Sequence, residues 1–95
     1  MAQADYTGWI VRSGAGHDRG ELFCVVGAEE GGQRLLLCDG KTRRLAKPKR
    51  KKPAHVTALA PCDHSAIQKL REGTPPSNRE LRRALAAFRA EHKEG

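Results

Sequence analysis

The residues with the clearest chemistry are eight Lys and Arg side chains crowded into the stretch KTRRLAKPKRKKP, Lys41–Pro53, which contains no Asp or Glu. Ammonium and guanidinium groups bind phosphate oxygens, Lys as a point charge and Arg through a planar fork of donors. A concentrated positive field attracts polyanions, and nucleic acid is the commonest polyanion in cells. The run therefore predicts an anion-binding surface, with anionic membranes and acidic protein surfaces as the other candidate partners.

All of the excess positive charge lies in this run. The 95 residues include eighteen Lys and Arg and eleven Asp and Glu, for a net charge of +7. Outside Lys41–Lys52, ten Lys and Arg stand against the eleven acids. A loop that served only solubility would mix the two signs. The charge distribution therefore favours a binding role over a merely solvated loop, and a nuclear-targeting signal in KPKRKK is a further alternative.

Catalytic and metal-binding chemistry has little support. A chain this short buries only about 60–65% of its unfolded surface, so a deep, walled pocket is hard to build. Structural zinc takes closely spaced ligand pairs, whereas Cys24 and Cys38 lie fourteen positions apart and Cys62 precedes His64 by two. Cys62 and His64 also lack any indicated orienting group or oxyanion donor. We expect no enzyme activity, no metal and no cofactor.

The cellular setting follows from what surrounds the three cysteines. Their number is odd, and the start of the chain, Met1–Gly8, is short and polar. Free thiols in a reducing cytoplasm fit this pattern. There is no run of about eighteen apolar residues, so we expect no membrane span. The sequence is interpreted as that of a cytoplasmic monomer.

Alternating apolar residues and turn signals predict the elements that position the basic run. A Gly-bounded loop, Gly16–Gly20, follows the first strand, EEGG forms a hairpin turn, and Asp39–Gly40 is a second turn. Five short strands are expected, over residues Thr7–Arg12, Glu21–Ala28, Arg34–Cys38, Lys41–Leu45 and Ala54–Ala60. Strands of this number and length favour a small closed or half-closed barrel, because closure removes exposed edges.

The last third of the sequence predicts a helical hairpin. The first helix has Asp63 or Ser65 as its N-cap and Gly73 as its stop. Ser77 and Glu80 form a capping box for the second. Its apolar stripe, expected to pack on the barrel or on the first helix, consists of Leu81, Ala84, Leu85 and Phe88. We therefore divide the chain into a barrel, residues 1–60, and a helical extension, residues 61–95, which either docks on the barrel or swings free.

The outer face of the second helix mixes the two charge signs. Its arginines are Arg79, Arg82, Arg83 and Arg89, and the acids that interleave with them are Glu72, Glu80, Glu91 and Glu94. Opposite charges three or four positions apart pair on a helix surface. The arginines could extend a nucleic-acid footprint, but ion pairing on a solvated face is favoured, and no site is predicted there.

With these elements in place, Thr7–His55 resembles the KOW motif and its flanks: a strand, a Gly-bounded basic loop, a second strand and a short hairpin. It looks like bacterial KOW-domain RNA-binding proteins, which are similar to KOW-containing proteins of the archaeal and eukaryotic large ribosomal subunit. The matching residues are Val11, Arg12, Ser13, Gly16, Asp18, Arg19, Gly20, Phe23, Val25, Val26, Gly27, Asp39, Gly40, Arg43, Pro48 and Lys49. Arg19 stands where the family often has Lys.

The resemblance implies a mainly β fold, a five-stranded SH3-like barrel that binds structured RNA, often in the ribosome. The residues expected to contact RNA are Arg12, His17, Arg19, Lys41, Arg43, Arg44, Lys47, Lys49, Arg50, Lys51 and Lys52. We expect positioned contacts from Arg43 and Arg44 on a strand, and a looser grip from Lys49–Lys52 in an extended connection bracketed by prolines. The alternative is a protein-interaction module whose basic run steers encounter with an acidic partner.

Roles are also expected for one histidine and three aromatic residues. His17 is either an exposed loop residue or a group that stacks on a base or binds a phosphate. Tyr6 and Trp9 could offer stacking surfaces, although Trp9 is more readily assigned to the core or the barrel end. Phe23, on the second strand, is expected in the core.

Overall fold

The computed structural model describes residues 6–62 and 64–91. Five strands come first: β1 (Trp9–Ser13), β2 (Leu22–Glu29), β3 (Arg34–Cys38), β4 (Lys49–Lys51) and β5 (Val56–Pro61). Two helices follow, α1 (Ser65–Arg71) and α2 (Asn78–Glu91), and short 3₁₀ turns occupy Glu30–Gly32 and Pro53–His55. Neither helix, over the residues described, is long and apolar enough to cross a membrane.

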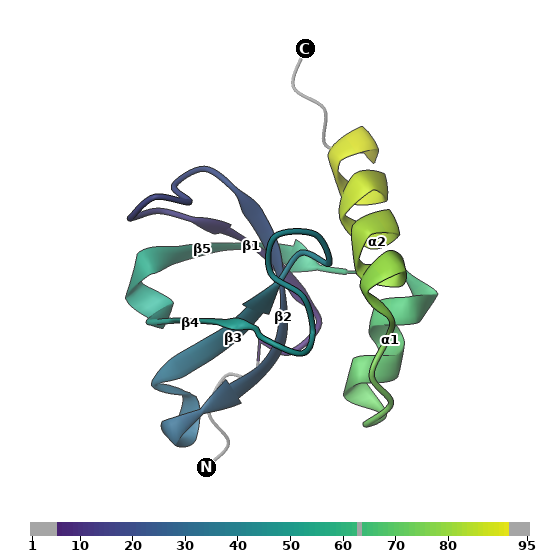
Figure 1. The fold of residues 1–95 in the computed structure, drawn as a ribbon, viewed down its shortest axis with the longest axis horizontal. Coiled ribbons are helices and arrows are strands. Elements are labelled where there is room, and N and C mark those ends of the chain that lie inside the picture. The colour runs from purple at the N-terminus through teal and green to yellow at the C-terminus, as the bar shows by residue number, and fades with distance from the viewer. Residues whose placement is uncertain (1–5, 63, 92–95) are drawn as a thin grey trace.

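The strands form one antiparallel sheet in the order β4-β3-β2-β1-β5 (Figure 1). Its register is irregular between Val25 and Gly27 in β2 and between Ile10 and Val11 where β1 meets β5. Irregularities of this kind bend a sheet and increase its twist. The expected mainly β fold with five strands and a C-terminal helix is confirmed. However, β4 and β5 remain edge strands, so the sheet is not closed.

The fourth strand does not lie at the position predicted from the sequence. Residues 41–45 were expected to be extended, but β4 is Lys49–Lys51, and residues 41–47 form turns. The turn arises because the Asp39 carboxylate accepts hydrogen bonds from the backbone of Lys41 and Arg43, each at 2.8 Å. A chain whose amides bond to a nearby side chain cannot offer them to a neighbouring strand. The basic connection expected over 49–52 is therefore mostly an edge strand.

The two faces of the sheet carry two apolar clusters. One buried cluster consists of Val11, Phe23, Val25, Leu35 and Leu37. The other face bears Ile10, Leu22, Cys24 and Cys38, which pack against Cys62 and the helices. The alternation in β2, where Leu22 and Cys24 face one way and Phe23 and Val25 the other, reflects the two-residue period of a strand. Phe23 is buried, as expected, with 2% of its surface exposed.

The helices cover one face of the sheet beside β2 (Figure 1). The capping box is present: the Ser77 amide donates to Glu80 Oε1 at 2.8 Å, and the Glu80 amide donates to Ser77 Oγ at 3.1 Å. The stripe on α2, with Leu81 and Leu85 fully buried, shares one cluster with Ile67 of α1 and the strand residues. Burying each such Leu stabilises the fold by about 1.5–3 kcal/mol. The helices therefore dock on the sheet.

Two predictions about the helices, the N-cap of α1 and the Arg–Glu pairs on α2, are not confirmed. Ser65 is the first residue of α1, while the alternative N-cap, Asp63, lies outside the described residues. The expected Arg–Glu pairs on α2 are absent from the described part of the chain: Glu80 binds Lys69 of α1 at 3.4 Å, and none of the four arginines pairs with Glu72, Glu80 or Glu91. Glu94 lies outside the described residues.

Candidate nucleic-acid interface

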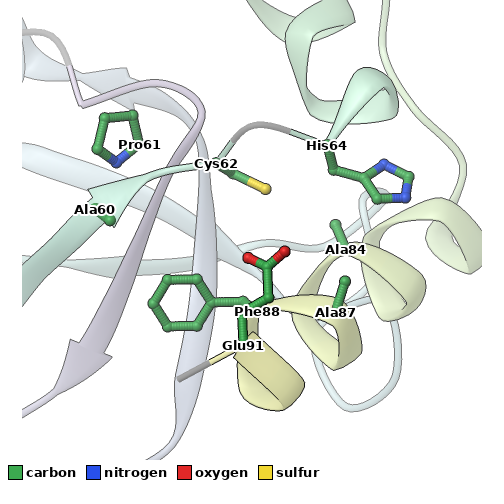
Figure 2. A pocket seen from close by; sticks show the side chains of 8 residues that line it. All are labelled: Ala60, Pro61, Cys62, His64, Ala84, Ala87, Phe88 and Glu91. Atoms are coloured by element: carbon green, nitrogen blue, oxygen red, sulfur yellow. The ribbon is translucent and has the colours of Figure 1, made fainter. Parts of the chain in front are cut away.

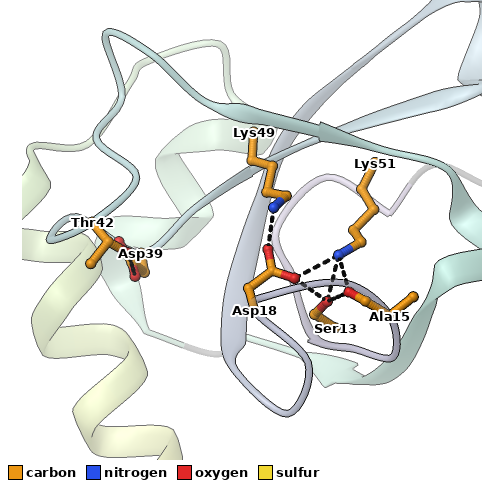
Figure 3. A network of polar contacts seen from close by, with 7 residues as sticks. All are labelled: Ser13, Ala15, Asp18, Asp39, Thr42, Lys49 and Lys51. Atoms are coloured by element: carbon orange, nitrogen blue, oxygen red, sulfur yellow. Dashed lines mark hydrogen bonds and ion pairs between the residues drawn. The ribbon is translucent and has the colours of Figure 1, made fainter.

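The Gly-bounded loop between β1 and β2 is fixed by a buried ionic network. Asp18 Oδ1 accepts hydrogen bonds from Lys51 Nζ at 2.6 Å and from Ser13 Oγ at 2.7 Å, and Asp18 Oδ2 lies 2.6 Å from Lys49 Nζ (Figure 3). Lys51 Nζ also donates to Ser13 Oγ and to the Ala15 carbonyl oxygen, at 2.6 and 2.7 Å. All three donors of this ammonium are therefore satisfied inside the protein.

The network has a defined ionisation state. Burial disfavours the charged form of Asp18. Hydrogen bonds from Lys49, Lys51 and Ser13 outweigh this effect and hold the pKa of Asp18 well below its usual value. The Lys51 side chain is only 8% exposed. A buried charge with a partner is tolerated where the same charge alone would be costly. Asp18 thus holds the loop against β4, and its charge is balanced there.

This network corrects the sequence interpretation of Lys49–Lys52. Lys51 is buried with its ammonium bonded to Asp18, and half-buried Lys49 forms an ion pair with Asp18. Arg50 Nε binds Glu29 Oε1 at 2.6 Å, and Glu29 raises the pKa of that guanidinium. Only Lys52 of this segment is exposed without an ion pair among the described residues. Three of the four charges assigned to a loose phosphate grip instead stabilise the edge of the sheet.

The loop after β3, residues 39–45, is organised by a second carboxylate. Besides the amides of Lys41 and Arg43, Asp39 accepts a hydrogen bond from Thr42 Oγ1 at 2.7 Å. Burial opposes ionisation of Asp39, but the bonds from Arg43, Thr42 and Lys41 prevail and lower its pKa. The expected turn at Asp39–Gly40 is confirmed, and it presents Lys41, exposed, and Arg43, half-buried, in fixed positions.

The two loops meet at one surface. An open hollow of about 330 Å³ lies between them. It is lined by His17, Asp18, Arg19, Glu21, Phe23, Thr42, Arg43 and Lys49. Four of the eleven residues expected to contact RNA therefore come together from segments about 25 positions apart. His17 and Arg19 are exposed there because Asp18, between them, points inward to the lysines.

The other expected contacts lie around this surface or away from it. Lys41 lines an adjoining hollow, and Arg44 and Lys47 are exposed on the same loop. Arg12 is exposed on β1, opposite Leu22 and Thr57 on the neighbouring strands, and lines neither hollow. Lys52 lies beyond β4 and lines neither. Arg12 and Lys52 therefore fall outside the candidate interface.

The adjoining hollow, of about 390 Å³, brings in residues that sequence reasoning did not assign. It is lined by Glu21, Asp39, Lys41, Thr42, Arg82, Leu85 and Arg89. Arg82 and Arg89 of α2 are seven positions apart, two helical turns, on the flank of the apolar stripe. The sequence shows this spacing. It does not show that the loop after β3 lies beside this flank of the helix.

A third cavity contains the Cys62 and His64 pair considered as a catalytic or metal site. It measures about 400 Å³, and apolar residues such as Ala84 and Phe88 make much of its wall. Figure 2 shows the His64 imidazole turned away from the Cys62 thiol. Within residues 6–62 and 64–91 no group of three or more His, Cys, Asp or Glu is arranged to hold a metal ion. His92, the fourth histidine, lies outside them.

The thiols are placed for packing. Cys24 and Cys38 stand opposite each other on β2 and β3 as fully buried, reduced thiols. Burial and the neighbouring Asp39 carboxylate raise the pKa of Cys38 to about 11. A thiol with such a pKa is protonated at neutral pH and is a poor nucleophile.

The aromatic side chains do not form a base-stacking platform at either basic hollow. Tyr6 and Trp9 pack edge to face, with ring centroids 5.5 Å apart, and line neither hollow. Phe23 lines the first hollow but is almost fully buried. The interface is therefore built from charge and backbone shape.

Comparison of the chain with protein-family models and with curated proteins finds no match in either. The KOW resemblance stays a prediction from the residues themselves.

Proposed function

We propose that this chain is an RNA-binding protein that holds the phosphate backbone of structured RNA against the two basic loops, residues 16–20 and 39–45. One observation carries the proposal: Asp18 and Asp39 are used internally to fix the loops that present Arg19 and Arg43 at one hollow. Side chains held in place lose less conformational entropy on binding. The loops therefore offer a preorganised anion-binding surface.

The type of nucleic acid follows from the same surface. Single-stranded RNA is commonly bound by stacking bases on exposed aromatic rings. RNA duplexes are recognised through phosphates, 2′-hydroxyls and shape. Because the basic hollows lack an exposed Phe, Tyr or Trp among the described residues, they favour a helical RNA element. We propose that the bent five-stranded sheet is an SH3-like fold of the KOW type, and that ribosomal RNA in the cytoplasm is the natural target.

The salt dependence of binding tests the proposal. Five charges lie on the two loops or, for Lys47, two residues beyond the second, and they are exposed or line the hollows: Arg19, Lys41, Arg43, Arg44 and Lys47. If all five contact phosphates, the logarithm of the affinity for a short RNA duplex should fall with the logarithm of salt concentration at a slope of about −4.5. A slope near zero in a fluorescence anisotropy titration rejects RNA binding by this surface.

The alternative function, a protein-interaction module, predicts a different result in cell extract. An RNA-bound or ribosome-bound protein sediments deep into a sucrose gradient and returns to the top after nuclease treatment. A protein held by another protein keeps its position after nuclease. Sedimentation at the top in both gradients contradicts ribosome association.

A further inference from the structure

The basic loop after β3 is built onto helix α2. Asn78 Oδ1 accepts a hydrogen bond from the Leu45 amide at 2.8 Å, and Arg82 Nη1 donates to the Gly40 carbonyl oxygen at 2.6 Å. Gly40 has φ +78°, and a side chain there would collide with the backbone of Asn78. The loop and the first turns of the helix are therefore packed closely, and α2 contacts the loop at Gly40 and Leu45, on either side of Lys41 and Arg43.

One flank of α2 continues the surface of this loop. Asn78, Arg82, Leu85 and Arg89 follow one another at spacings of four, three and four, so they lie along one side of the helix. Arg82 and Arg89 line the same hollow as Lys41 and Thr42. The seven positions between Arg82 and Arg89 correspond to about 10.5 Å of rise along the helix axis. The positive side chains of loop and helix therefore share one face of the molecule.

The charges on this flank are available. Neither Arg82 nor Arg89 forms an ion pair with a described carboxylate, and Arg82 uses one guanidinium nitrogen on the Gly40 carbonyl. Of the two acids that line the hollow, Asp39 is occupied by the loop backbone and Thr42. Glu21, which is exposed and lines both basic hollows, is the other. Three cations therefore face two carboxylates in this hollow, a net charge of +1, and Glu21 opposes the cations at the junction of the hollows.

From this juxtaposition we infer that α2 carries part of the RNA-binding surface: Arg82 and Arg89 bind phosphates of the same RNA helix that the loops hold. The inference rests on the proposed function and extends it from the sheet to the C-terminal helix. Arg82 has a second role as a positioning residue for the loop, so its replacement would change both. Among the described residues, Arg89 makes no hydrogen bond to the loop backbone, so it is the cleaner probe.

The test compares two arginines of one helix in the full chain. Arg89→Gln removes a charge that faces the hollow, whereas Arg83→Gln removes an exposed charge that lines neither hollow. One phosphate contact contributes about 0.9 to the salt slope, or about eightfold in affinity at 0.1 M salt. We expect Arg89→Gln to weaken binding of a short mixed-sequence RNA duplex by about this factor, and Arg83→Gln to change it by less than about twofold.

A third variant tests the sign of the effect. Glu21→Gln removes the acid at the junction, so it should tighten binding of the same duplex. Equal effects of Arg89→Gln and Arg83→Gln, or weaker binding by Glu21→Gln with an unchanged melting temperature, would overturn the inference. The proposed function fails separately, if the unmodified protein binds the duplex without a steep salt dependence.

Discussion

Lys51 Nζ donates to Asp18 Oδ1 at 2.6 Å although the two residues are 33 positions apart. The contact joins the Gly-bounded loop to the edge strand β4 and turns two lysines of the basic run toward the interior. It separates the charges that build the fold from those that remain available to a ligand. Arg19 and His17 are exposed because the residue between them is held in this way.

Removing the central carboxylate should destabilise the protein strongly. Asp18→Asn leaves Lys51, 8% exposed, without its counter-charge. Breaking a buried ion pair at one side costs about 3–5 kcal/mol, and the partial exposure of Asp18 reduces this to about 2–4 kcal/mol in the free energy of unfolding. Urea denaturation measures the change.

A double-mutant cycle identifies the cause. In Asp18→Asn with Lys51→Met the buried charge is gone, so the double variant should be more stable than Asp18→Asn alone. Glu29→Gln, which breaks the exposed pair with Arg50, is the control and should lose much less. Equal losses for Asp18→Asn and Glu29→Gln would show that burial of the network contributes nothing.

The same carboxylates predict how stability depends on pH. The pKa values of Asp18 and Asp39 are lower in the folded protein than the unfolded value of about 3.9. The unfolded state therefore binds protons first as the pH falls. The contribution is fully present above about pH 5 and is lost as the pH falls through the folded pKa values.

Urea midpoints at pH 7 and pH 3 measure this loss. The unmodified protein should lose more stability between the two than Asp18→Asn, which lacks the main titrating group. Parallel losses in both proteins would contradict the assignment to Asp18.

Gly40→Ala should detach the basic loop from α2. Gly40 has φ +78°, and an added Cβ would meet the Asn78 carbonyl oxygen. Gly31→Ala is the matched control, because Gly31 also has a positive φ, +66°, but open space around it. The control should lose only the conformational term, roughly 1–2 kcal/mol.

Gly40→Ala should lose more stability than this control and also bind RNA less tightly, because Lys41 and Arg43 are no longer held in place. Thermal melting and anisotropy measure the two effects. If both variants lose the same stability and keep the same affinity, the contact between loop and helix has no role.

Four of the five strands could be predicted from the sequence, but the strand within the basic run could not. Alternation identified β1 and β5, whereas β2 and β3 were identified as short apolar runs joined by a hairpin turn. Lys49–Lys51 has no apolar residue, and its extended form depends on β3 and on Asp18, distant in sequence. The prediction of a strand at Lys41–Leu45 was wrong. The sequence indicated a turn at Asp39, but it did not show that the Asp39 carboxylate accepts hydrogen bonds from the amides of Lys41 and Arg43.

The candidate interface was predicted in part for the same reason. His17, Arg19 and Arg43 were identified from charge and from the Gly-bounded loop, and the structure brings them together. Arg50 and Lys51 have the same residue types but are consumed by Glu29 and Asp18. The residue type shows which side chains can bind a phosphate. Whether a carboxylate of the protein already pairs with such a side chain depends on the fold.

The most direct test of the central claim is a salt titration of RNA duplex binding for three proteins. Lys41→Gln with Arg43→Gln removes two charges from the interface, and Lys52→Gln removes an exposed charge of the same run that lies outside it. We predict that the double variant lowers the magnitude of the slope by about 2, and that Lys52→Gln leaves the slope within about 0.3 of the unmodified protein. Equal slopes for all three proteins would contradict RNA binding by the two loops.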